Sequence, residues 1–133
     1  MLSAIQLELH PKRKHVRQTF IIEQFFAALN ARDWNRAARF CTPELVVRPL
    51  SAPAVALVGF PSGLLTYRAL MEQRFSALPD YTFEEVQVFR RPVGVAVRYM
   101  SRWEDRAGVV HHLAGSQHFR FDGGRIAQIE GAF

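Results

Sequence analysis

The sequence contains a single cysteine, Cys41, so no disulfide can form within the chain. This excludes the small secreted domains that depend on such bridges, and it fits a reducing compartment. We therefore expect a cytoplasmic protein. The residues directly beside Cys41 are neither histidine nor acidic, and we interpret its thiol as a small buried apolar group.

The sequence also shows no segment typical of export or of a membrane span. Near its start the basic residues follow the apolar ones, which is the reverse of a signal peptide. Residues 49–67 carry no charged side chain, but three prolines and two glycines would break a spanning helix there. We expect no membrane partner.

Acidic residues are the minority, with 12 against 17 basic ones and a net charge of +5. Four of the basic residues and one acidic residue lie in residues 1–20, which leaves a mildly basic body. Short basic runs usually face solvent, whereas a nucleic-acid site needs cations spread over a folded face. We therefore expect one domain over residues 1–133, with residues 1–15 as a basic leader or helix extension, and nucleic acid is not an expected partner.

The first part of the chain predicts two helices. In residues 11–32, apolar side chains repeat at the helical spacing 0, 3, 4 and 7, at Ile22, Phe25, Phe26 and Leu29. The second helix, over residues 34–41, is short. Asp33 before it is a strong N-cap, because its carboxylate accepts from the first free N–H groups.

The middle of the chain alternates between extended and helical patterns. Residues 42–44 predict a turn and residues 45–48 a short strand, which a loop over residues 51–61 follows. Ser62 can cap a third helix, whose apolar stripe runs to about Leu78.

The last fifty or so residues predict four antiparallel strands. Alternating apolar residues define these strands over residues 81–89, 94–103, 109–121 and 125–130. Asp122-Gly123-Gly124, between the last two, is a strong hairpin signal. Helices followed by a run of antiparallel strands predict an α+β fold, with a curved sheet and the helices on its concave side.

The order and spacing of four short motifs resemble the nuclear transport factor 2-like superfamily, in its SnoaL-like branch. They are Leu29-Asn30-Ala31-Arg32-Asp33-Trp34, Leu78-Pro79-Asp80, Val95-Ala96-Val97-Arg98-Tyr99 and Phe121-Asp122-Gly123-Gly124-Arg125-Ile126. The resemblance covers about residues 16–133. It implies a cystatin-like α+β barrel, in which a cone-shaped, curved antiparallel sheet is wrapped by three helices of the N-terminal half. It also implies a small apolar or aromatic ligand in the cone, and a homodimer through the outer face of the sheet.

Members of this superfamily perform several reactions, so the resemblance does not fix an activity. The ketosteroid isomerase type uses a tyrosine on the first helix, where this chain has Phe25 and Phe26. The scytalone dehydratase type has an acid where Asn30 stands. The limonene epoxide hydrolase type has an arginine and an aspartate two residues apart, and here Arg98 is kept while Met100 replaces the acid.

Three residues are candidates for catalysis. Arg98 offers a fork of donors for an oxyanion, His111 can act as a general base, and Glu130 can act as an acid or base at the mouth of the cone. Each also has a structural interpretation, as an exposed or interface arginine, a hydrogen-bonded histidine and a surface glutamate. The direction of Arg98 is open: alternation with Val97 and Tyr99 turns it outward, whereas the resemblance turns it inward.

The residues that we expect to line the ligand site are Trp34, Tyr67, Met100, Trp103 and Gln117. His111 and His112 are adjacent, so they point to opposite faces of a strand and cannot bind one metal as a pair. We expect neither a metal nor a cofactor. Two functions stay open: a small isomerase, cyclase or hydratase acting on an apolar carbonyl or aromatic compound, and a noncatalytic ligand-binding or protein-interaction subunit.

Overall fold

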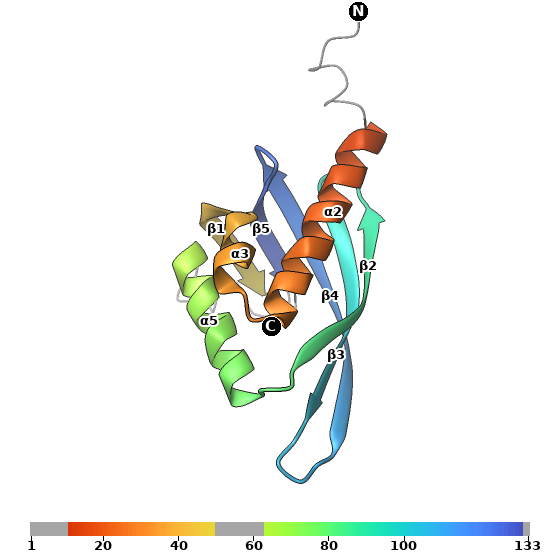
Figure 1. Cartoon of the computed structure of the whole chain (residues 1–133). Coiled ribbons are helices and arrows are strands. Elements are labelled where there is room, and N and C mark those ends of the chain that lie inside the picture. Colours follow the sequence, from red (N-terminus) through yellow and green to blue (C-terminus); the bar gives the residue numbers. More distant parts are fainter. Residues whose placement is uncertain (1–10, 50–62, 132–133) are drawn as a thin grey trace, which may run out of the picture.

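The computed structural model describes residues 11–49 and 63–131, and all helices, strands and contacts given below belong to these ranges (Figure 1). The predicted loop over residues 51–61 and the predicted helix cap at Ser62 lie outside them. No helix within these ranges is long and apolar enough to cross a membrane.

Three helices form where the apolar spacing predicts them: α2 (Pro11–Asn30), α3 (Trp34–Arg39) and α5 (Leu64–Ala77). The four apolar residues that predict α2 are each at most 2% exposed. Asp33 caps α3 as predicted, since its Oδ1 accepts from the backbone N–H of Arg36 at 3.2 Å.

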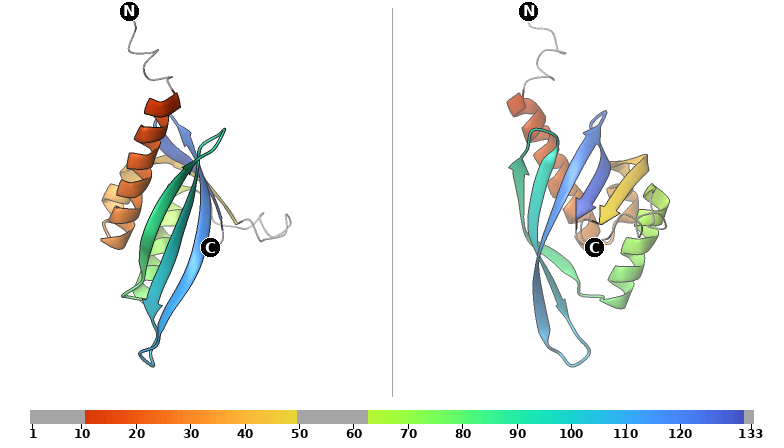
Figure 2. Two further views of the ribbon diagram at one scale, coloured as in Figure 1. Left: turned by 90° about the vertical axis from the view of Figure 1, so that its right-hand side faces the viewer. Right: turned by 180° about the vertical axis from the view of Figure 1, so that it is seen from behind.

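Five strands form one sheet in the order β1-β5-β4-β3-β2. Four of them are antiparallel neighbours, as predicted: β2 (Thr82–Arg90), β3 (Val95–Glu104), β4 (Val110–Asp122) and β5 (Arg125–Gly131). β1 (Cys41–Pro49) pairs in parallel with β5, so the sheet is mixed. All three helices lie on one side of the sheet, and the β3–β4 hairpin extends beyond them (Figure 1, Figure 2).

The start of β1 corrects one prediction. Residues 42–44 are not a turn, and the second helix does not reach Cys41, because α3 ends at Arg39 and β1 begins at Cys41. Pro43 is tolerated in this strand because β1 is an edge strand. Its pairing with β5 is also irregular between Cys41 and Val46, so a missing N–H there disrupts no regular ladder.

A bulge in β2 keeps two apolar residues on the same side of the sheet. Phe83 pairs with Ser101 and Val88 with Val97, so the six residues of β2 from Phe83 to Val88 match only five of β3. The register shifts between Glu84 and Gln87, and Glu85 there has a φ of 53°. The extra residue lets β2 turn apolar side chains toward the core on both sides of the bulge.

The sheet has an inner face, which the helices cover, and an outer face. The residues of β3 on the inner face are Val95, Val97, Tyr99, Ser101 and Trp103. The core beneath the helices is aromatic: Phe25 and Phe26 of α2 each meet Phe119 edge-on, with ring centroids 6.1 and 5.9 Å apart. The α+β fold predicted from the sequence is therefore confirmed.

Candidate functional site

Polar side chains gather on the inner face of the sheet. Within the described ranges the buried polar residues are Ser101 and Gln117, which are 3% and 6% exposed. All three tyrosines of the chain, Tyr67, Tyr81 and Tyr99, are buried as well. Tyr99 and Tyr81 lie close enough to Tyr67 to raise its pKa, and Tyr81 has the same effect on the pKa of Tyr99. We call these five residues the inner polar cluster.

Tyr81 and Ser101 form one half of the cluster. The Tyr81 hydroxyl donates to Ser101 Oγ at 2.7 Å, and both groups are buried. The Tyr81 ring packs edge-on against Phe75, with centroids 5.3 Å apart, and stacks on Trp103 at 5.9 Å. Rings on two sides therefore fix the position of the hydroxyl.

Two glycines make room for the other half of the cluster. Tyr99 lies directly across from Gly115, and a methyl group added at Gly115 would come within 2.3 Å of the Tyr99 ring. The same ring meets Phe83 edge-on at 5.0 Å. A methyl group at Gly131 would come within 2.6 Å of Gln117 Cγ. Glycine at these positions permits the close approach of a neighbouring side chain.

The hydroxyls of Tyr67 and Tyr99 keep their protons at neutral pH. Burial raises the pKa of Tyr99 to about 12, an effect that the nearby Tyr81 increases and that Arg74 and a hydrogen bond with Gln117 oppose. Burial also raises the pKa of Tyr67. The cluster therefore presents neutral hydroxyl and amide groups, which bind a carbonyl or hydroxyl but do not act as strong bases.

His111 lies on the same face, near the end of the β3–β4 hairpin. It is directly across from Trp103, and the two rings stack with centroids 5.3 Å apart and an interplanar angle of 12°. His111 Nε2 is 2.8 Å from Asp105 Oδ2, and this hydrogen bond is the main reason why the pKa of Asp105 is lowered. The imidazole is thus held in place while its side chain remains 42% exposed.

Arg98 and Glu130 lie on the outer face. Arg98 is exposed, and its guanidinium carbon is 5.3 Å from the centroid of the Phe89 ring. Glu130 is directly across from His118, on the side opposite the buried Ile129, and accepts from Gln128 Nε2 at 2.6 Å. Simple alternation thus decides the direction of Arg98, and the inward direction implied by the resemblance is wrong. Since His111 is on the inner face, the three candidates for catalysis do not meet.

The predicted ligand-site residues are divided in the same way. Tyr67, Trp103 and Gln117 belong to the inner face or to its cover, but Met100 points outward because it alternates with Tyr99. Trp34 packs edge-on against Phe75 with centroids 5.4 Å apart. It lines a hollow of only about 10 Å³, which is room for about one water molecule and not for a ligand.

Sequence reasoning missed Tyr81, Tyr99 and Ser101 as site residues. At inward positions of strands such residues look like ordinary core, and only contacts between strands show that their polar atoms converge. Gly115 was the one sequence signal for this site. A glycine in the middle of a long strand often marks a place where a neighbouring side chain approaches the backbone closely. Within residues 11–49 and 63–131, no group of three histidine, cysteine or acidic residues is placed to hold a metal ion.

Comparisons with known proteins agree with this fold. No curated protein matches the sequence. Among solved structures, a polyketide cyclase-like protein from Xanthomonas campestris pv. campestris has a TM-score of 0.71 at 17% identity, with 90% of this chain and 91% of that one covered. Bal32a, from a soil-derived mobile gene cassette, has a TM-score of 0.74 at 15% identity, with 90% of both chains covered.

A third structure, a cystatin fold protein from Novosphingobium aromaticivorans, has a TM-score of 0.70 at 16% identity, with 87% of this chain and 97% of that one covered. At these identities the likeness shows the fold alone. The family is shown by the sequence itself: the model of the SnoaL-like domain matches residues 22–129, and the chain therefore belongs to the SnoaL-like domain family.

Proposed function

We propose that this SnoaL-like protein binds a small, mostly apolar or aromatic molecule on the inner face of its sheet. The inner polar cluster would contact a carbonyl or hydroxyl group of that molecule. The observation that carries the proposal is the convergence of five uncharged polar side chains inside a shell of aromatic rings. The similarity to polyketide cyclase-like structures supports a ligand of this class.

The uncharged state of the cluster favours a neutral ligand group. Buried polar atoms cost free energy unless they are paired, and a bare charge costs far more. The cluster contains no carboxylate, imidazole or ammonium group, so it offers no counter-charge. Neutral O–H and N–H donors suit a carbonyl oxygen, and aromatic walls suit the flat body of an aromatic compound.

Acid–base chemistry of the isomerase, cyclase or hydratase type is a second candidate function, which the position of His111 favours. Its imidazole is fixed by Asp105 and lies on the same face as the cluster, at the edge of the ring stack formed with Trp103. In such a reaction His111 would take the proton and the tyrosine hydroxyls would stabilise the oxyanion. Binding without turnover would instead support the noncatalytic alternative.

The binding proposal is tested by ¹H–¹⁵N NMR titration with two uncharged matched compounds, the ketone 2-acetylnaphthalene and naphthalene. Both should shift inner-face amides of β3 and β4. Tyr99→Phe should weaken binding of the ketone about 3–10-fold, the value of one hydrogen bond, and leave that of naphthalene unchanged. Arg98→Ala, on the outer face, is the matched control and should change neither affinity. Saturable shifts confined to the outer face, or none at all, would refute the proposal.

We also propose that the protein is cytoplasmic and forms a homodimer through the outer face. Ala114 is exposed on that face, directly across from Met100, near the middle of the β3–β4 pair. Ala114→Glu should shift the mass in sedimentation equilibrium toward the monomer, because it places like charges together in a two-fold contact. Leu65→Glu, at an exposed position of α5, should not. A wild-type monomer at high concentration would overturn the proposal.

A further inference from the structure

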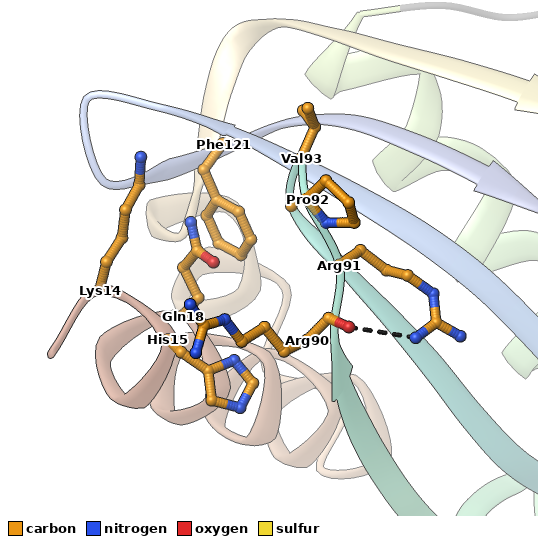
Figure 3. Close-up of a pocket in the computed structure, with 9 residues that line it drawn as sticks. Lys14, His15, Gln18, Arg90, Arg91, Pro92, Val93 and Phe121 are labelled. Atoms are coloured by element: carbon orange, nitrogen blue, oxygen red, sulfur yellow. Dashed lines mark hydrogen bonds between the residues drawn. The ribbon is translucent and has the colours of Figure 1, made fainter. Parts of the chain in front are cut away.

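A groove of about 770 Å³ lies at the other end of the inner face, between the first turns of α2 and the β2–β3 turn (Figure 3). We call it the basic groove; its lining residues are Lys14, His15, Gln18, Arg90, Arg91, Pro92, Val93, Gly94 and Phe121. None of them belongs to the inner polar cluster. Arg90 is directly across from Val95, and Tyr99 of the cluster lies four residues further along β3, so about 13 Å of strand separates Tyr99 from that position. Gln117, another member of the cluster, is directly across from Val97.

The charge of the basic groove has one sign. Its lining includes Lys14, Arg90 and Arg91 but no carboxylate. None of these three cations takes part in a salt bridge with the residues that the structure describes. Cations gathered in a concave surface without counter-charges attract an anion, and several together favour a phosphate over a singly charged carboxylate.

The two arginines differ in direction. Figure 3 shows the guanidinium of Arg90 extended toward His15 and Gln18 of α2. The side chain of Arg91 turns the other way, and its Nη1 donates to the backbone carbonyl of Arg90 at 3.1 Å. Arg90 is therefore the residue that offers its planar fork of donors to a ligand in the groove.

One polar atom of the groove lining lacks a partner within the described residues. His15 Nδ1 is buried and makes no hydrogen bond. A buried polar atom without a partner is uncommon and costs about 1–3 kcal/mol. Because no protein atom holds the imidazole at Nδ1, the ring can turn so that this nitrogen donates to a phosphate oxygen in the groove.

The opposite wall is apolar. Phe121 is half-buried and its ring faces the groove, and Val93 is 57% exposed at the rim (Figure 3). The volume is within the range of small-molecule sites. We propose that the basic groove binds a small organic phosphate ester, with its phosphate at Arg90, His15 and Lys14 and its apolar body against Phe121.

The proposal is tested by isothermal titration calorimetry with phenyl phosphate on the full chain at low salt. Arg90→Gln should weaken binding about tenfold or more, the loss of a charge-assisted contact. Arg91→Gln is the matched control, because it removes the same charge one residue away, and it should weaken binding less than about threefold. Circular dichroism confirms that both variants are folded. An equal loss in both would mean general charge attraction and would overturn the assignment.

Further titrations identify the source of the phosphate and separate the two sites. Inorganic phosphate should bind more weakly than phenyl phosphate, and equal affinity would overturn the contribution of Phe121. A short DNA duplex that binds more tightly than phenyl phosphate, and loses its affinity in Arg90→Gln, would make nucleic acid the occupant and refute the small-molecule proposal. Tyr99→Phe should leave phenyl phosphate binding unchanged, because Tyr99 lies about 13 Å along β3 from Val95, the residue directly across from Arg90.

Discussion

Replacing Tyr81 by phenylalanine removes one hydroxyl group and leaves Ser101 Oγ buried without its 2.7 Å hydrogen bond. The ring itself stays, so its contacts with Phe75 and Trp103 are kept. An unsatisfied buried hydroxyl costs about 1–3 kcal/mol, and we expect Tyr81→Phe to destabilise the protein by that amount. Ser101→Ala leaves the Tyr81 hydroxyl unpaired and should cost a similar amount.

The double variant should cost less than the two single changes together. When both hydroxyl groups are removed, neither is left buried without a partner. We therefore expect the double variant to be more stable than the sum of the two single changes implies, by about 1–2 kcal/mol. Urea unfolding at neutral pH gives the free energy of unfolding of the wild type, the two single variants and the double variant. Ser116→Ala removes an exposed hydroxyl from the outer face of β4 and should change the free energy of unfolding by less than about 0.5 kcal/mol. If the single costs of Tyr81→Phe and Ser101→Ala add to the double cost within about 0.3 kcal/mol, the two hydroxyls do not interact and the geometry of the cluster is wrong.

Three further results are expected. Gly115→Ala should cost about 1–3 kcal/mol in urea unfolding and move the Tyr99 ring, and unchanged NMR shifts of that ring would contradict the close contact. Burial raises the pKa of both Cys41 and Tyr99 to about 12, from ordinary values of 9.0 and 10.0, so as the pH rises the unfolded chain loses the Cys41 proton above about pH 9 and the Tyr99 proton above about pH 10. Stability should therefore fall by about 1.4 kcal/mol per pH unit for each group until the pH approaches 12, and Cys41→Ala should flatten the first part of that decline. Asp105→Ala removes the acceptor of the Val109 N–H, which donates to the Asp105 carboxylate at 3.0 Å, and should speed the amide exchange of Val109. An unchanged exchange rate would show that this hydrogen bond does not stabilise the hairpin.

Much of the fold follows from local patterns. The spacing of apolar residues in α2 predicts a helix with one buried face, and the carboxylate of Asp33 predicts a helix N-cap; the structure has both. The alternation in β3 also decides the direction of Arg98, against the resemblance. The start of β1 could not be foreseen in this way, because Pro43 is acceptable only in an edge strand and the sequence does not state the strand order.

The candidate site is harder to predict, because it depends on pairs of residues far apart in the chain. Gly115 and Tyr99 are each ordinary residues of a strand, and only the register between β3 and β4 puts one beneath the other. The basic groove depends in the same way on β2 and α2 meeting: Arg90 and His15 are 75 residues apart. Periodicity describes which side of an element a residue occupies, but it does not say which element lies opposite.

The parallel pairing of β1 with β5 has a consequence for how the chain folds. More than eighty residues separate the partners in this pair, as between Arg48 and Glu130, so the contact closes a loop that contains most of the domain. During synthesis β1 emerges long before β5, the strand that it pairs with. Until the pair forms, the apolar side chains of Leu45 and Val47, which are buried in the folded protein, stay exposed. The pair at the edge of the sheet is therefore expected to form late, after the helices and the β2–β3–β4 hairpins. Conditions that slow this last step should favour aggregation through β1.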